Sequence, residues 1–159
     1  MEQIKFRGKS LKTGEWVFGS YVFTYNCCYI FNSEYCLIGE DDPTPYFVEV
    51  DGKTVGQLLD IEEKSGKELY EGDICKVHVF TQELGENMGV REGELEFMAS
   101  LNFCSSGVSL ESGGENSGPI WAYGGFHEES LELVGNIYDN PDLLPIDLTP
   151  TEADHQPFD

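Results

Sequence analysis

The chain has 159 residues and carries thirty Asp and Glu against nine Lys and Arg, which gives a formal net charge of -21. Its apolar fraction of 40% and its aromatic fraction of 13% are typical of a globular protein, so the acidity does not indicate wholesale disorder. Such a charge repels phosphate backbones and anionic membranes, and we therefore expect neither direct nucleic-acid binding nor membrane binding.

The first third of the chain predicts a β-hairpin. Residues 4–7 alternate apolar and polar side chains, and residues 16–23 are dense in β-branched and aromatic side chains. Turn-forming residues at 12–15 separate the two stretches. A second aromatic-rich stretch, residues 28–38, follows and ends before Pro43, which is typical of a strand that is broken by a loop.

The middle of the chain predicts a second hairpin and then a buried strand. Residues 46–50 and 54–59 flank Asp51-Gly52, a dipeptide that is favoured in tight hairpin turns because glycine accepts a positive φ. Residues 74–80 alternate in a way that suits a strand with at least one buried face. The Glu-Gly-Asp step at 71–73 is common where small SH3-like barrels begin.

The second half predicts further short strands separated by loops. Apolar side chains recur at every second position from 95 to 103, which is the clearest strand pattern in the chain. Residues 105–107 and 112–118 are rich in Ser and Gly, which indicates turns or loops. Residues 120–126 and 131–138 predict two more strands.

The chain is expected to divide into an N-terminal β subdomain over 1–60 and a barrel subdomain over 61–144, which share one core. Residues 145–159 form an acidic, Pro-rich tail. Before this tail, Asn140 is a candidate helix cap with Pro141 in the first turn, and at most one turn of helix fits. No long amphipathic helix is present in the pattern, so the periodicity favours a β-rich chain.

Three segments carry a more specific signal: residues 1–9 (MEQIKFRGK), residues 54–74 with their closing run GKELYEGDI, and residues 133–144 (LVGNIYDNPDLL). In type, order and spacing they resemble the three blocks of the YopX family of phage and prophage proteins. The resemblance implies a mainly β fold, with an N-terminal β-hairpin sheet plus an SH3-like β-barrel and little helix. It implies no established activity and supplies no catalytic residues, and a fold alone does not define a function.

Five cysteines form an odd set without regular spacing: Cys27, Cys28, Cys36, Cys75 and Cys104. No signal peptide or apolar run of the roughly 18 residues that cross a membrane accompanies them, which predicts reduced thiols in the bacterial cytoplasm. Cys27-Cys28 with Cys36, or Cys75 with His78, lack the ligand number and spacing of structural zinc. A nucleophile pair of Cys75 or Cys104 with His127 is outweighed by inert buried thiols. We therefore predict no metal, no cofactor and no catalytic residue.

Two other features have both a functional and a structural interpretation. The glycine-rich loop 112–118 carries Glu115 where a phosphate cradle would need a base, which favours a flexible loop. The aromatic side chains would form either a peptide-binding groove or a core, and the core is the better prediction for a small β protein. These side chains are Trp16, Tyr21, Tyr25, Tyr29, Tyr35, Trp121 and Tyr123.

The charge pattern predicts a non-catalytic, acidic protein-interaction module. After Arg91 the chain has fourteen acids and no base, and such a surface accelerates encounter with a basic host or phage protein. The candidate surface comprises Glu92, Glu94, Glu96, Glu128, Glu129, Trp121 and Tyr123.

Two further hypotheses remain at this point. The bases near the N-terminus would drive self-assembly if one subunit presented them to the acidic half of another; they are Lys5, Arg7, Lys9 and Lys12. Alternatively, the chain is a small-ligand-binding protein or a small enzyme with a pocket between the barrel and the N-terminal sheet.

Overall fold

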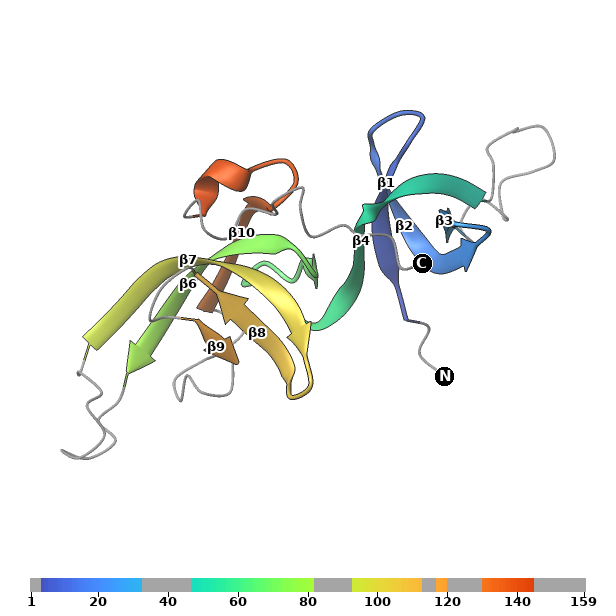
Figure 1. Ribbon diagram of the computed structural model, residues 1–159. Helices are drawn as coiled ribbons and strands as arrows, with labels where there is room; N and C mark the ends of the chain where they lie inside the picture. The colour runs from blue at the N-terminus through green and yellow to red at the C-terminus, as the bar shows by residue number, and fades with distance from the viewer. Residues whose placement is uncertain (1–3, 33–46, 82–92, 113–116, 120–129, 145–159) are drawn as a thin grey trace. The chain divides into compact units, whose positions relative to one another are not determined.

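A computed structural model describes residues 4–32, 47–81, 93–112, 117–119 and 130–144 (Figure 1). The described part is mainly β, as predicted, with antiparallel pairing in two five-stranded sheets and little helix. The chain divides into two compact units, residues 1–58 and residues 59–159. The SH3-like barrel stays a prediction.

The N-terminal unit contains four strands that pair in a closed circuit. They are β1 (Phe6–Ser10), β2 (Trp16–Thr24), β3 (Cys27–Phe31) and the first part of β4 (Phe47–Glu62). Strand β1 pairs with β2 and β4, and β3 also pairs with β2 and β4, so each strand has two neighbours. The predicted β1–β2 hairpin is confirmed, and in its turn the amide of Ser10 donates to the carbonyl of Glu15 at 2.9 Å.

One face of these strands forms the small core of the N-terminal unit. Ile30 and Val50 are almost completely buried on adjacent strands. Gly8 lies on the same face, and a Cβ added to it would stand 2.9 Å from the Cγ2 atom of Val50. That distance is below van der Waals contact, so glycine at this position is required by close packing between β1 and β4.

The predicted hairpin at Asp51-Gly52 is wrong, because β4 runs without interruption from Phe47 to Glu62. The irregularity that the dipeptide produces is a bulge: β1 advances from Arg7 to Lys9 while the facing β4 residue changes from Gly56 to Asp51. The extra β4 residues bend the strand without reversing it.

Local hydrogen bonds hold this bulge. The Asp51 carboxylate accepts from the amide of Lys53 at 3.0 Å, and the Thr54 hydroxyl donates to the Asp51 carbonyl at 2.7 Å. The same hydroxyl oxygen accepts from the amide of Lys9 at 2.8 Å. Gly52 serves close packing here rather than a turn, because an added Cβ would lie 2.8 Å from the Cys28 sulfur.

The C-terminal unit contains a sheet with the order β10-β6-β7-β8-β9. Its strands, in chain order, are β6 (Asp73–Thr81), β7 (Gly93–Cys104), β8 (Gly107–Glu111), β9 (Gly118–Pro119) and β10 (Leu131–Asn136). A short strand, β5 (Glu68–Tyr70), pairs with β4. The strands predicted over 74–80 and 95–103 are confirmed, and the strand predicted over 131–138 is present but ends at Asn136. The strand predicted over 120–126 lies outside the described residues.

The core of this unit comes from one face of β6, β7, β8 and β10, together with Leu59 of β4 and Leu69 of β5. Its fully buried side chains are Leu59, Leu69, Cys75, Val77, Val79, Ala99, Leu101, Leu110 and Leu131. The alternation predicted for β6 therefore holds, since Cys75, Val77 and Val79 point into the core. Lys76 and His78, on the opposite face, remain accessible at the surface.

The segment after β10 is a hydrogen-bonded turn leading into one 3-10 turn, Pro141–Leu143. The predicted turn of helix with Pro at its start is confirmed, but Asn140 makes no side-chain cap. Its side-chain oxygen instead accepts from the amide of Asn136 at 3.3 Å. The Asn136 side-chain oxygen in turn accepts from the amides of Tyr138 and Asp139, so the third family-like block stabilises a turn.

Candidate functional site

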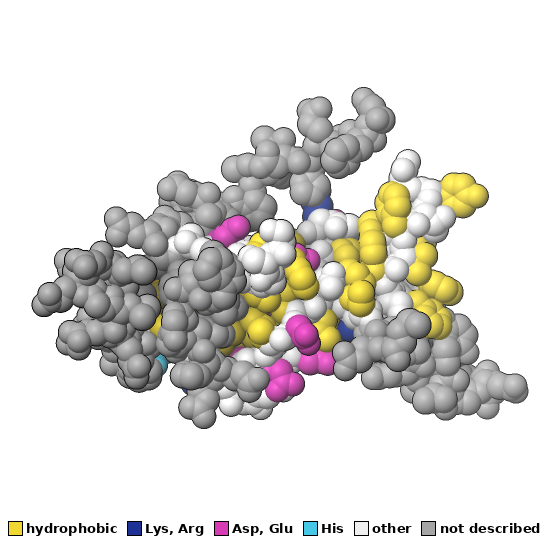
Figure 2. All heavy atoms as spheres, turned by 90° about the horizontal axis from the view of Figure 1, so that it is seen from below, with side chains coloured by type: hydrophobic (Ala, Val, Ile, Leu, Met, Phe, Trp, Pro, Cys, Tyr) yellow, Lys and Arg dark blue, Asp and Glu magenta, His cyan; other side chains and the backbone are white. Residues whose placement is uncertain are grey.

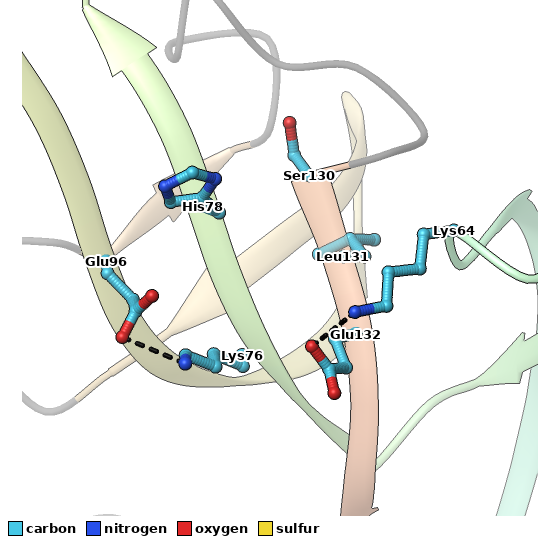
Figure 3. Close-up of a pocket in the computed structure, with 7 residues that line it drawn as sticks. All are labelled: Lys64, Lys76, His78, Glu96, Ser130, Leu131 and Glu132. Atoms are coloured by element: carbon cyan, nitrogen blue, oxygen red, sulfur yellow. Dashed lines mark hydrogen bonds and ion pairs between the residues drawn. The ribbon is translucent and has the colours of Figure 1, made fainter.

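A small pocket of about 130 Å³ lies on the outer face of the C-terminal sheet (Figure 3). Strands β6, β7 and β10 form its floor, with Lys76 opposite Glu132 and His78 opposite Glu96 in the register. The lining residues are Lys64, Lys76, His78, Glu96, Ser130, Leu131 and Glu132. The alternation of the strands is what places these polar side chains together, because every second residue faces outward.

The lysine and glutamate side chains that line this pocket form two ion pairs. The Nζ atom of Lys76 lies 3.0 Å from the Glu96 carboxylate, and that of Lys64 lies 2.5 Å from the Glu132 carboxylate (Figure 3). The hydrogen bond that Lys76 donates to Glu96 raises the pKa of Lys76, and the hydrogen bond that Lys64 donates to Glu132 lowers the pKa of Glu132. All four groups are solvent-accessible, so the pairs stabilise the fold only weakly. Together they form a charge ladder that runs from β7 and β6 to β10 and the loop after β4.

Two buried carboxylates in the C-terminal unit have structural roles. Glu63 accepts from the amide of Ser65 at 3.2 Å and from the amide of Leu133 at 3.3 Å. Asp73 accepts from the amide of Tyr70 at 2.8 Å within the second family-like block. Backbone donors therefore hold both carboxylates, which is how buried charged groups are accommodated in a fold.

In the N-terminal unit, two cations flank the indole of Trp16. The Arg7 guanidinium carbon lies 4.5 Å from the ring centroid, and the Lys9 ammonium lies 5.4 Å from it. Both distances fall within the range of cation–π interactions. Arg7 is only 7% exposed, so the premise that the N-terminal bases form an exposed strand is wrong for this residue. The Arg7 guanidinium instead contacts the Trp16 ring and so links β1 to β2.

Only part of the predicted acidic surface lies within the described residues. Glu96 is exposed and paired with Lys76, and Glu94 lies opposite Phe80 on β7. The other five members lie outside the described residues: Glu92, Glu128, Glu129, Trp121 and Tyr123. The sequence pattern does not predict Lys64 and Glu132 as pocket residues. They are 68 positions apart in the sequence and meet only because the fold brings the loop that contains Lys64 next to β10.

The aromatic side chains considered for a groove do not share one surface. Trp16 and Tyr29 lie on one face of the N-terminal strands, and Tyr21 lies on the opposite face with Phe6, at a ring-centroid distance of 5.5 Å. Tyr25 is in the turn between β2 and β3 and is almost fully exposed. The remaining three, Tyr35, Trp121 and Tyr123, lie outside the described residues.

The described thiols and imidazole do not converge. Cys27 and Cys28 are adjacent on β3 and point to opposite faces, and Cys75 points into the core while His78 faces the pocket. Burial is the main cause that raises the pKa of the Cys75 thiol, which makes it a poor nucleophile. Within the described ranges no group of three or more His, Cys, Asp or Glu could hold a metal ion. Cys36 and His127 lie outside these ranges.

Comparison with known families gives a match over most of the chain. The family model described as "YopX protein" covers residues 5–145, which is most of the chain. No curated protein matches the sequence. In the part of the chain that the structure describes, no helix has the length and apolarity required to cross a membrane.

Proposed function

The chain belongs to the YopX family, and from that premise we propose that it is a phage- or prophage-encoded accessory protein whose acidic C-terminal unit binds a basic protein in the bacterial cytoplasm. It acts as an interaction module without catalysis. The observation that carries this proposal is the uneven distribution of charge between the two units.

The C-terminal unit holds nearly all of the excess negative charge. Residues 59–159 contain twenty-two acids against four bases, whereas residues 1–58 contain eight acids against five bases. Charge of one sign concentrated on one unit creates a field that attracts a partner of opposite charge and accelerates the encounter. A compact unit with such an imbalance is therefore suited to a basic partner.

The bases of this unit neutralise little of that charge. Lys64 and Lys76 already pair with Glu132 and Glu96. The buried pair Glu63 and Asp73 serves the fold, but exposed carboxylates such as Glu111 remain on the surface. The unit therefore offers a surplus of solvated carboxylates, which a partner rich in Lys and Arg would complement.

The pocket on the sheet gives less support to a small-ligand receptor or enzyme. Its volume of about 130 Å³ is below the roughly 300 to 1,000 Å³ of typical small-molecule sites. Its two lysines are engaged in ion pairs, so binding an anion there would require those pairs to break. The alternative of a pocket between a barrel and the N-terminal sheet stays a prediction.

Capture from a nuclease-treated bacterial lysate tests the proposal. We compare the full chain with the double variant Glu111→Gln/Asp142→Asn in the C-terminal unit, and with Glu15→Gln/Glu49→Gln as the control. Both variants change the net charge from -21 to about -19, so they differ only in the unit that is altered. We expect captured proteins of high isoelectric point, and about fivefold weaker capture for the C-terminal variant alone, the scale of two exposed charge contacts. Equal losses for both variants, or captured proteins no more basic than the lysate, would overturn the proposal.

A further inference from the structure

The β2–β3 hairpin is free of charge in a chain that is otherwise rich in it. Between Glu15 and Glu34 no Lys, Arg, Asp, Glu or His occurs, although a quarter of all residues are charged. Strands β2 and β3 pair antiparallel and reverse through a two-residue turn, with Thr24 opposite Cys27. The result is an uncharged hairpin in the N-terminal unit.

Large apolar side chains of this hairpin are exposed to solvent. Tyr25 is 96% exposed and Phe23 is 61% exposed, and Phe18 and Val22 each expose more than a third of their surface. Phe47, at the start of β4, is 54% exposed and packs against Phe31 of β3 with ring centroids 4.9 Å apart. Figure 2 shows hydrophobic side chains along the described strands of the N-terminal unit, with no acidic side chain among them on this face. By the register of the strands, Phe18, Val22 and Phe47 lie on one face, with Tyr25 at the turn, whereas Phe23 lies on the opposite face. Exposed apolar surface along one face of this kind marks an interaction site.

The turn of the hairpin is strained in a way that the fold does not require. Tyr25 has a φ of 49° and Asn26 a φ of 63°, so both central residues are left-handed, as in a type I′ turn. Glycine or asparagine would take the first position with less strain, since a bulky residue there costs about 1 kcal/mol or more. A side chain that is almost wholly exposed returns little packing energy to offset this cost. Strain combined with exposure points to a role outside the folded monomer.

We propose that this hairpin is a self-association surface and that its occupant is the same hairpin of a second copy of the chain. Two copies with a charge of -21 each repel one another wherever carboxylates meet, so contact is favoured where both surfaces carry no charge. A basic partner would find no carboxylate on the hairpin itself to recognise. The inference is independent of the proposed basic partner, which binds the other unit.

The exposed apolar area of the hairpin determines how tightly two copies are expected to associate. An aromatic side chain buries roughly 150 to 250 Å² when fully covered, so Phe18, Tyr25 and Phe47 together expose roughly 400 Å² per copy. A stable complex buries about 800 Å² per partner. The hairpin therefore supports a weak dimer, with a dissociation constant in roughly the micromolar range or weaker.

Sedimentation velocity on the full chain tests this proposal. We expect the mass to rise from 17.8 kDa toward the dimer between about 5 and about 500 µM protein. The rise should be larger at about 500 mM salt than at about 50 mM, because salt screens the repulsion between like-charged copies. Association that weakens with salt would instead indicate contact between the N-terminal bases and an acidic surface and would overturn the proposal, as would a monomer under all conditions.

Variants of the turn distinguish the effect of the Tyr25 side chain on association from the effect of the left-handed backbone. Tyr25→Gly removes the side chain and relieves the left-handed backbone, so it should weaken association at least about fivefold without destabilising the fold. Asn26→Gly also relieves the turn but keeps Tyr25, and it should associate like the wild type. Phe103→Ser removes an exposed aromatic side chain of β7, in the other unit, and should also leave association unchanged. Equal association of Tyr25→Gly and the wild type would refute the role of the hairpin. Tyr25-dependent binding to phosphatidylcholine vesicles by a chain that stays monomeric would assign the hairpin to a membrane surface and equally overturn the proposal.

Discussion

Replacement of Gly8 by alanine gives the sharpest test of the packing inside the N-terminal unit. The added Cβ would lie 2.9 Å from Cγ2 and 3.0 Å from Cβ of Val50, and Val50 is 2% exposed. A side chain this buried on a strand has little freedom to move, so β1 and β4 must separate slightly. Overpacking of this kind costs about 1 to 3 kcal/mol, and we expect Gly8→Ala to destabilise the fold by that amount.

Truncation of the facing side chain supplies the control. Val50→Ala alone should also destabilise the fold, by about 1 to 3 kcal/mol, because it leaves a cavity. In the double variant the new methyl group of residue 8 occupies part of that cavity, so the two penalties should be less than additive by about 1 kcal/mol. Urea unfolding followed by far-UV circular dichroism measures all three variants. Strictly additive penalties, or a Gly8→Ala protein as stable as the wild type, would refute the close approach of β1 and β4.

Three further predictions concern the C-terminal unit. Burial raises the pKa of Cys75, whereas the hydrogen bond with Ser106 lowers the pKa of the accessible Cys104 thiol, so Cys104→Ser should remove more native-state labelling by a thiol reagent than Cys75→Ser. Because Lys64 lowers the pKa of Glu132, this pair stabilises the fold above the unfolded pKa of Glu132, near 4.5, and the stabilisation is lost as the pH falls through the folded pKa. Glu132→Gln should therefore weaken the dependence of stability on pH at the acid end, measured by urea unfolding. An unchanged pH dependence would contradict the pairing. Asp73→Ala leaves the buried amide of Tyr70 without its acceptor and should cost about 1 to 3 kcal/mol in the same assay, while an unaltered midpoint would argue against that bond.

Strand patterns in this chain were readable from sequence where one face is buried. The apolar alternation from 95 to 103 and from 74 to 80 corresponds to β7 and β6, whose inward residues form one core. Alternation is a direct consequence of the two-residue repeat of a strand, so it can be recognised in the sequence without knowing which other strands the segment packs against. The prediction of a mainly β fold rests on this local signal.

Turns were predicted less well because local preference competes with packing. The Asp51-Gly52 dipeptide favours a reversal, yet the chain continues through it as a bulge, with Gly52 packed against Cys28. The turn predicted at 105–107 does join β7 to β8, whereas a further tight turn lies at Tyr25-Asn26, which lacks the usual glycine. Asn26 is an ordinary turn former, but Tyr25 gives no signal for the turn, since it adopts a backbone conformation that tyrosine rarely takes.

The pocket and the charge ladder required the register of the sheet. Glu96 was anticipated as part of an acidic surface, but its partner Lys76 lies on the neighbouring strand and Lys64 comes from the loop after β4. Cross-strand neighbours depend on how strands align, which composition does not encode. The excess of acids in the C-terminal unit, in contrast, follows from the sequence once the boundary between the units is known.

The most direct test of the proposed function is the salt dependence of binding between the purified chain and a protein captured with it. Attraction between an acidic unit and a basic partner predicts an affinity that falls steeply between about 50 and about 500 mM salt, with the association rate falling most. Competition by double-stranded DNA is expected if the partner normally holds nucleic acid. An affinity that is unchanged or that rises over this range of salt would contradict the proposal that the acidic C-terminal unit recognises its partner by charge.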